Sequence, residues 1–105
     1  MRNTNPTNRY ASFVTWGNAG KTEDVDRLMD VLVMNDDLAT TKLVDYALGL
    51  VDTRDGRARL RHYLFNGSQQ QRNYAALYFK RRGLVDFLDE AIALGLIDQA
   101  QAYSK

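Results

Sequence analysis

Arginine is the residue type in this sequence whose number and spacing could best support binding chemistry. Eight of the chain's 14 basic residues fall between positions 54 and 82, where Asp55 is the only acid. A guanidinium group donates in a planar fork that matches the oxygens of carboxylate and phosphate groups. The cluster therefore predicts a surface that binds one of these two anionic groups.

Helical spacing would place part of this cluster on one surface. Arg54, Arg57 and Arg61 fall within about 60° of one another on a helical wheel. Three tyrosines follow in the same region: Tyr63, Tyr74 and Tyr78. Their rings could stack against bases or guanidinium planes. Three interpretations stay open: the arginines pair with the chain's own carboxylates, bind an acidic protein segment, or bind nucleic acid.

The predicted binding surface has seven members: Arg54, Arg57, Arg61, Tyr63, Arg72, Lys80 and Arg81. Arg72 differs from the others because it projects into the apolar arc of its helix, between Ala75 and Ala76. A buried guanidinium needs an anionic partner. We expect Asp86 or Asp45 to supply it.

The segment GNAGKT, residues 17–22, ends in the Gly-Lys-Thr triplet of phosphate-binding loops. Such a loop needs four residues between its two glycines, so that successive backbone N–H groups can wrap the phosphates. Gly17 and Gly20 enclose only two residues, and Thr15 stands where the first glycine is required. No parallel sheet is predicted to hold the loop. The segment is therefore interpreted as a glycine turn before a helix.

Neither the single histidine nor the acidic residues form a catalytic or metal-binding pattern. His62 is flanked by Arg61 and Tyr63, which supply neither a nucleophile nor a second metal ligand. Asp26 and Asp30 share a helix face, but a solvated surface explains them better than a cation site. We expect no enzymatic activity, no metal site and no cofactor.

Composition favours a small single-domain protein of a reducing compartment. The chain has 105 residues, 45% of them hydrophobic, a net charge of +1 and no cysteine. This length suits one domain with its own core, and the lack of cysteine excludes disulfides and thiolate metal sites. The first residues contain no apolar stretch typical of a secretory signal, and no segment is apolar enough to span a membrane. We expect a cytoplasmic protein that does not enter a membrane.

Apolar side chains at three- and four-residue spacing predict an all-α domain of about five short helices. Residues 1–9 are expected to form a flexible arm, residues 10–105 a single helical domain, and residues 10–16 either a short helix or a docked extended segment. The helices are predicted over residues 22–35, from 37 or 40 to 51, 53–65, 68–83 and 84–95. Ser68 and Gln71 form a capping box, and Asn66-Gly67 is a helix stop. Short connections would make successive helices antiparallel neighbours.

A repeated motif extends this picture. Leu43-Val44-Asp45-Tyr46 recurs 41 residues later as Leu84-Val85-Asp86-Phe87, and helix-pair repeats have periods of about 40 to 47 residues. Residues 71–79, with an arginine near the start and two alanines in the middle, resemble the inner helix of a HEAT-type repeat. Residues 37–95 thus resemble a HEAT or armadillo-type repeat protein. The resemblance implies helical hairpins stacked as a superhelix, or a small bundle, and no particular activity.

These observations favour a non-catalytic module that binds a protein or peptide through the basic surface of the third and fourth predicted helices. A nucleic-acid-binding protein using the same arginines is the alternative. A short stack of hairpins leaves apolar faces at its ends, so self-association is a further expectation. It would use Leu94, Leu96 and Ile97, or residues 10–16.

Overall fold

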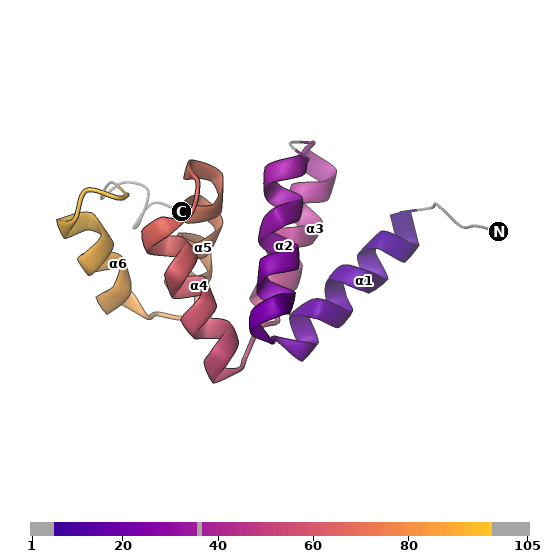
Figure 1. The fold of residues 1–105 in the computed structure, drawn as a ribbon, viewed down its shortest axis with the longest axis horizontal. Helices are drawn as coiled ribbons and strands as arrows, with labels where there is room; N and C mark the ends of the chain where they lie inside the picture. Colours follow the sequence, from indigo (N-terminus) through magenta and orange to yellow (C-terminus); the bar gives the residue numbers. More distant parts are fainter. Residues whose placement is uncertain (1–5, 36, 98–105) are drawn as a thin grey trace. The chain divides into compact units, whose positions relative to one another are not determined.

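Every regular element in the described residues is an α-helix. The structure, a computed structural model, describes residues 6–35 and 37–97, with side chains from residue 10 onward. Within these ranges Figure 1 labels six helices: α1 (Pro6–Ala19), α2 (Thr22–Met34), α3 (Leu38–Gly49), α4 (Arg54–Asn66), α5 (Gln69–Arg81) and α6 (Val85–Ala93). The predicted all-α class is confirmed, and the described residues form six helices rather than about five.

The additional helix is α1, where the sequence left a short helix and an extended segment open. Pro6 occupies its first position, where a missing N–H is harmless and the fixed φ of proline suits a helix. Residues 6–9 of the predicted arm therefore belong to α1, and residues 1–5 lie outside the described residues. Gly17 lies inside α1 rather than ending it. Gly20, with a φ of 62°, follows the last helical residue.

The helix ends follow local capping chemistry. The Asp37 carboxylate accepts a hydrogen bond from the backbone N–H of Thr40 at 2.9 Å, which begins α3. At the start of α5, the Ser68 hydroxyl accepts from the N–H of Gln71 at 3.2 Å, and the Ser68 N–H donates to the Gln71 side chain at 2.9 Å. The predicted capping box is thus confirmed. Gly83 and Gly95, with φ of 70° and 76°, follow α5 and α6.

Helix α2 begins at Thr22, the first residue of the predicted range. Lys21 rather than Thr22 is the capping residue, and its backbone N–H donates to the Asp24 carboxylate at 3.3 Å. Asp24 is buried and also accepts from Arg27 at 2.8 Å. The Asp24 carboxylate in the first turn thus accepts a hydrogen bond from the residue that precedes the helix.

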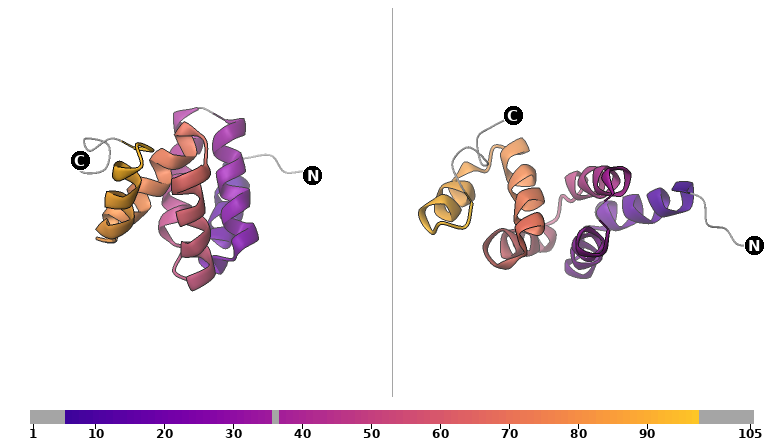
Figure 2. Two further views of the ribbon diagram at one scale, coloured as in Figure 1. Left: turned by 60° about the vertical axis from the view of Figure 1, so that its left-hand side comes forward. Right: turned by 90° about the horizontal axis from the view of Figure 1, so that it is seen from above.

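The chain divides into two compact units at Arg57, inside α4. The first unit holds α1, α2 and α3, which pack against one another (Figure 2), and the start of α4. Its buried apolar side chains are Phe13, Val25, Leu28, Met29, Leu32, Val44, Ala47, Leu48 and Val51. The single domain over residues 10–105 stays a prediction.

Glycines in the first unit permit close backbone contacts, which explains the GNAGKT segment. A Cβ at Gly17 would lie against the carbonyl oxygen of Ala47, so the glycine lets α1 approach α3. The Thr53 hydroxyl donates to the Gly20 carbonyl at 2.5 Å and accepts from the Gly56 N–H at 2.8 Å. The segment therefore connects three helices, as a structural turn.

The second unit holds the remainder of α4 with α5 and α6. Helices α5 and α6 pack together through the rings of Phe79 and Phe87, whose centroids lie 5.2 Å apart. Arg61 connects α4 to α6 through Glu90 and Phe87. The fully buried side chains of this unit include Leu60, Leu64, Ala75, Phe79, Leu88 and Ala91.

The two copies of the four-residue motif occupy different places in their helices. Val44 lies in the middle of α3 and is buried, whereas Val85 is the first residue of α6 and is 41% exposed. HEAT-type stacking of helical hairpins stays a prediction. Residues 98–105 of the predicted helical domain lie outside the described residues. None of the described helices is both long and apolar enough to cross a membrane.

Candidate functional site

The seven predicted surface residues are shared between the two units. Arg54 and Arg57 belong to the first unit. Five belong to the second: Arg61, Tyr63, Arg72, Lys80 and Arg81. The first three arginines nonetheless lie on the same helix, because α4 runs through the boundary.

The arginines at the start of α4 have different surroundings. Arg54 is exposed. Arg57 donates to the carboxylate of Asp52 at 2.9 Å, which supports the first of the three interpretations, pairing within the chain. An exposed ion pair of this kind contributes little to stability, but it reduces the charge that Arg57 offers to a ligand.

Two of the three tyrosines are not available for stacking against a ligand. Tyr63 is 9% exposed because it shares the inner face of α4 with Leu60 and Leu64, and the Arg59 guanidinium lies 5.5 Å from its ring centroid. Tyr78 is 3% exposed, with the Arg82 guanidinium 4.6 Å from its ring centroid. Tyr63 is therefore buried rather than part of a surface. Both rings have a guanidinium of the chain itself as a neighbour, which is one of the two stacking partners that we expected.

Arg72 does not form the predicted ion pair with Asp86. Its Nε is buried and has no hydrogen-bond partner among the described residues. Arg72 lies in the first turn of α5, and the end of that helix at Arg81 is roughly 13 Å away along its axis. Asp86 lies beyond that end, in the first turn of α6. Asp45, the other predicted partner, belongs to the first unit.

Lys80 and Arg81 lie in the last turn of α5, where positive charge is favourable for the helix dipole. Arg81 is exposed and Lys80 half-buried. Both take part in interactions within the chain. They contribute positive charge to this end of α5.

Arg61 has the geometry best suited to binding an anion. Its guanidinium carbon lies 4.7 Å from the ring centroid of Phe65 and 5.4 Å from that of Phe87. Its Nη2 donates to Glu90 at 3.4 Å, and the two side chains are 45% and 51% exposed. This distance is long for a charge-assisted hydrogen bond. The two phenyl rings therefore orient the Arg61 guanidinium, which has five N–H donors. The Glu90 carboxylate contacts it only weakly.

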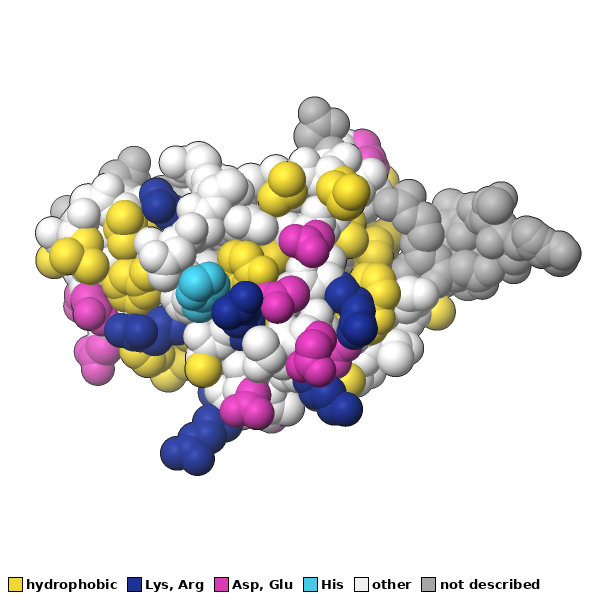
Figure 3. All heavy atoms as spheres, in the orientation of Figure 1, with side chains coloured by type: hydrophobic (Ala, Val, Ile, Leu, Met, Phe, Trp, Pro, Cys, Tyr) yellow, Lys and Arg dark blue, Asp and Glu magenta, His cyan; other side chains and the backbone are white. Residues whose placement is uncertain are grey.

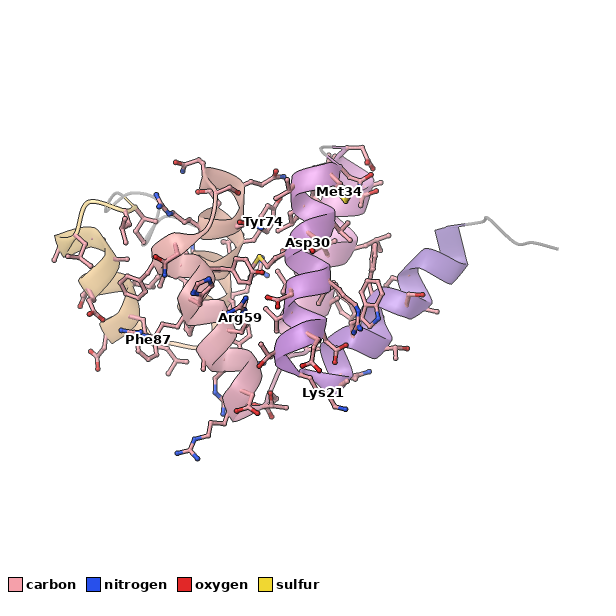
Figure 4. All side chains as sticks on the ribbon, in the orientation of Figure 1. Lys21, Asp30, Met34, Arg59, Tyr74 and Phe87 are labelled. Carbon is pink, nitrogen blue, oxygen red and sulfur yellow. The ribbon has the colours of Figure 1, made fainter. Side chains whose placement is uncertain are left out.

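An open pocket lies next to this arginine. It has a volume of ≈ 300 Å³ and is lined by Gly83, Leu84, Val85, Asp86 and Phe87. Phe87, labelled in Figure 4, lies at the start of α6 and contributes to both the pocket and the surroundings of Arg61. We call Arg61, Phe65 and the pocket residues 83–87 the Arg61 site. Figure 3 shows basic side chains beside hydrophobic ones where α4 and α6 approach each other.

No family model, curated protein or solved structure matches this chain. The chemistry of its residues must therefore carry any functional argument. In the described part of the chain, no three potential metal ligands lie together. His62 is exposed and contacts Asn66, at 3.5 Å, and the edge of the Tyr63 ring.

Sequence reasoning named Arg61 and missed the residues that orient it. Phe65 follows Arg61 by four residues, so helical spacing alone could have paired them. Phe87 and Glu90 come from α6, and no local pattern connects them to α4. Their role depends on how α4, α5 and α6 pack within the second unit.

Proposed function

We propose that this chain is a non-catalytic binding module that recognises an acidic protein segment through the Arg61 site. The orientation of Arg61 by Phe65 and Phe87 is the observation that supports the proposal most strongly. A guanidinium held beside two rings loses less conformational entropy when it binds a carboxylate. A carboxylate from a partner can displace the long contact to Glu90 at small cost.

The charge of the second unit supports an acidic partner. Counted over the sequence, residues 58–105 contain seven basic and four acidic residues, a net charge of +3. Residues 1–57 contain seven basic and nine acidic residues, a net charge of −2. A net positive charge on this unit raises the rate at which acidic segments meet it.

The proposal is tested by fluorescence anisotropy with a labelled peptide of alternating Glu and Gly. We expect salt-sensitive binding that weakens about tenfold in Arg61→Gln, equivalent to one lost charge-assisted contact. Arg54→Gln is the matched control, because it removes the same charge from an exposed site on the same helix. Equal losses in both variants, or no binding to the wild-type protein, would refute the proposal.

Nucleic-acid binding is the second candidate, favoured by the excess of arginine over acid between residues 54 and 82. The same assay with a labelled oligouridylate tests it. Phosphate binding would weaken steeply between about 50 and 200 mM salt, and most of it would be lost when Arg57 and Arg61 are both changed to Glu. Tighter binding of the oligouridylate than of the acidic peptide would favour this candidate over the first.

We also propose that the helices stack as HEAT-type hairpins. We further propose a cytoplasmic location, because the absence of cysteine fits a reducing compartment.

Self-association of the chain through its exposed apolar side chains is the last proposal. Of the apolar faces considered, Ile97 and Phe13 are buried, whereas Leu94 is 62% and Tyr10 39% exposed. Sedimentation equilibrium of Leu94→Gln against wild type tests self-association. An unchanged molecular mass, equal to that of a monomer in both proteins, would refute it.

A further inference from the structure

The pocket next to Arg61 has no role in binding a carboxylate. Its apolar lining comes from Leu84, Val85 and Phe87, at the junction of α5 and α6. Val85, the first residue of α6, is 41% exposed. Gly83 has open space around the position of a Cβ, so the pocket is accessible from solvent.

The size of the pocket suits a single side chain. Its volume of ≈ 300 Å³ is at the lower end of the range for small-molecule sites, and it is open rather than enclosed. An apolar side chain that enters it would cover Val85 and the exposed part of Phe87. Burial of a side chain of leucine size is favourable by roughly 1.5 to 3 kcal/mol when it is complete, so partial burial is sufficient to affect affinity.

Phe87 places the apolar pocket directly beside the cation. Its ring centroid lies 5.4 Å from the guanidinium carbon of Arg61, and the same side chain lines the pocket. Consecutive Cα atoms are about 3.8 Å apart, so neighbouring residues of one segment can reach both places. Asp86 also lines the pocket. Its carboxylate disfavours an acidic side chain inside the pocket.

We propose that the Arg61 site recognises a two-residue pattern, in which an apolar side chain enters the pocket and the adjacent Asp or Glu side chain binds Arg61. This inference rests on the proposed function and specifies its ligand. The pocket selects among acidic segments by the residue next to the acid. Acidic sequences that lack an apolar neighbour bind more weakly.

The test uses three peptides with acetylated and amidated ends, so that a glutamate side chain is the only carboxylate. Their central pairs are Leu-Glu, Ser-Glu and Leu-Gln, in identical Gly/Ser flanks. Each is titrated into the isotope-labelled full chain, and amide chemical shifts of residues 83–87 report binding by NMR. Val85→Ser tests the pocket. Val33→Ser, the same change at an exposed valine of α2, is its matched control.

We expect the Leu-Glu peptide to bind at least about fivefold more tightly than either of the others. Val85→Ser should remove the preference for Leu-Glu over Ser-Glu, and Val33→Ser should keep it. Equal affinity for Leu-Glu and Ser-Glu would overturn the pocket inference and leave the proposed function standing. Equal affinity for Leu-Glu and Leu-Gln would refute carboxylate recognition itself. Both results come from the wild-type protein, so they do not depend on the folding of a variant.

Discussion

At the residue scale, Gly17 determines how closely α1 approaches α3. A Cβ there would overlap the carbonyl of Ala47, whereas a Cβ at Gly49, also helical, meets nothing within 4 Å. Gly17→Ala should therefore destabilise the fold by about 1 to 3 kcal/mol through overpacking. Gly49→Ala should be neutral or stabilise by about 0.5 kcal/mol. Urea unfolding of both variants measures the difference, and equal free energies of unfolding would contradict the close contact of α1 with α3.

Tyr10 offers a second prediction at this scale. Desolvation raises its pKa above 10.0, and the charge and hydrogen bond of Tyr46 raise it further; the two rings stack 6.0 Å apart. The folded chain therefore holds the phenol proton more tightly than the unfolded chain does. That stabilisation is present below the unfolded pKa of about 10 and is lost as the pH rises through the folded pKa.

Tyr46→Phe should lower the pKa of Tyr10 in an NMR titration of its ring, because it removes two of the three causes. The desolvation remains, so the pKa should stay above that of an unfolded tyrosine. An unchanged pKa of Tyr10 in this variant would show that its ring does not contact Tyr46 in solution.

The sequence prediction of single residues failed where burial decides their position. Arg61 was named from its spacing, but Tyr63 was placed on the surface although it shares a face of α4 with Leu60 and Leu64. The many arginines of that helix favoured a surface position for Tyr63 as well. The three- and four-residue spacing of 60, 63 and 64 was sufficient to place Tyr63 inward.

At the scale of an element, the start of α5 depends on two hydrogen bonds between Ser68 and Gln71. Ser68→Ala removes one of them and should lower the free energy of unfolding by about 1 kcal/mol. Ser12→Ala is a control, because it changes an exposed serine within α1. Chemical denaturation followed by circular dichroism compares the two. Similar midpoints would mean that the capping box contributes nothing to stability.

Helix boundaries were predictable from sequence because caps are local. Asp37, Ser68 and the glycine stops each act within four residues, and the structure places helix ends beside all of them. The contact of Thr53 with Gly20 spans 33 residues, so no pattern in the sequence revealed it. The same limit applies to Phe87 beside Arg61.

At the scale of the whole molecule, the two units have net charges of opposite sign: −2 on residues 1–57 and +3 on residues 58–105. Binding of an acidic peptide to the second unit should therefore weaken several-fold as salt rises from about 50 to 200 mM, as the Debye length shortens. The apolar contribution of the pocket should persist. Anisotropy titrations of the Leu-Glu peptide at both salt concentrations measure this, and salt-independent binding would contradict an electrostatic role for Arg61.

Fold class could be predicted from the sequence alone, because apolar periodicity determines which residues form helices and which side of each helix faces the core. The division of the basic cluster between two units could not. Arg54 and Arg61 share a helical wheel, yet the boundary between compact units falls between them. The sequence therefore predicted one surface of seven residues, and the structure gives one well-oriented arginine with an adjacent pocket.

The most direct test of acidic-segment recognition is an NMR map of the wild-type chain during titration with the Leu-Glu peptide. We predict shifts at the amides of residues 83–87 and at the Arg61 side chain, with the resonances of α1, α2 and α3 unchanged. Shifts confined to the first unit, or a peptide that leaves Arg61 unperturbed at saturation, would contradict the account.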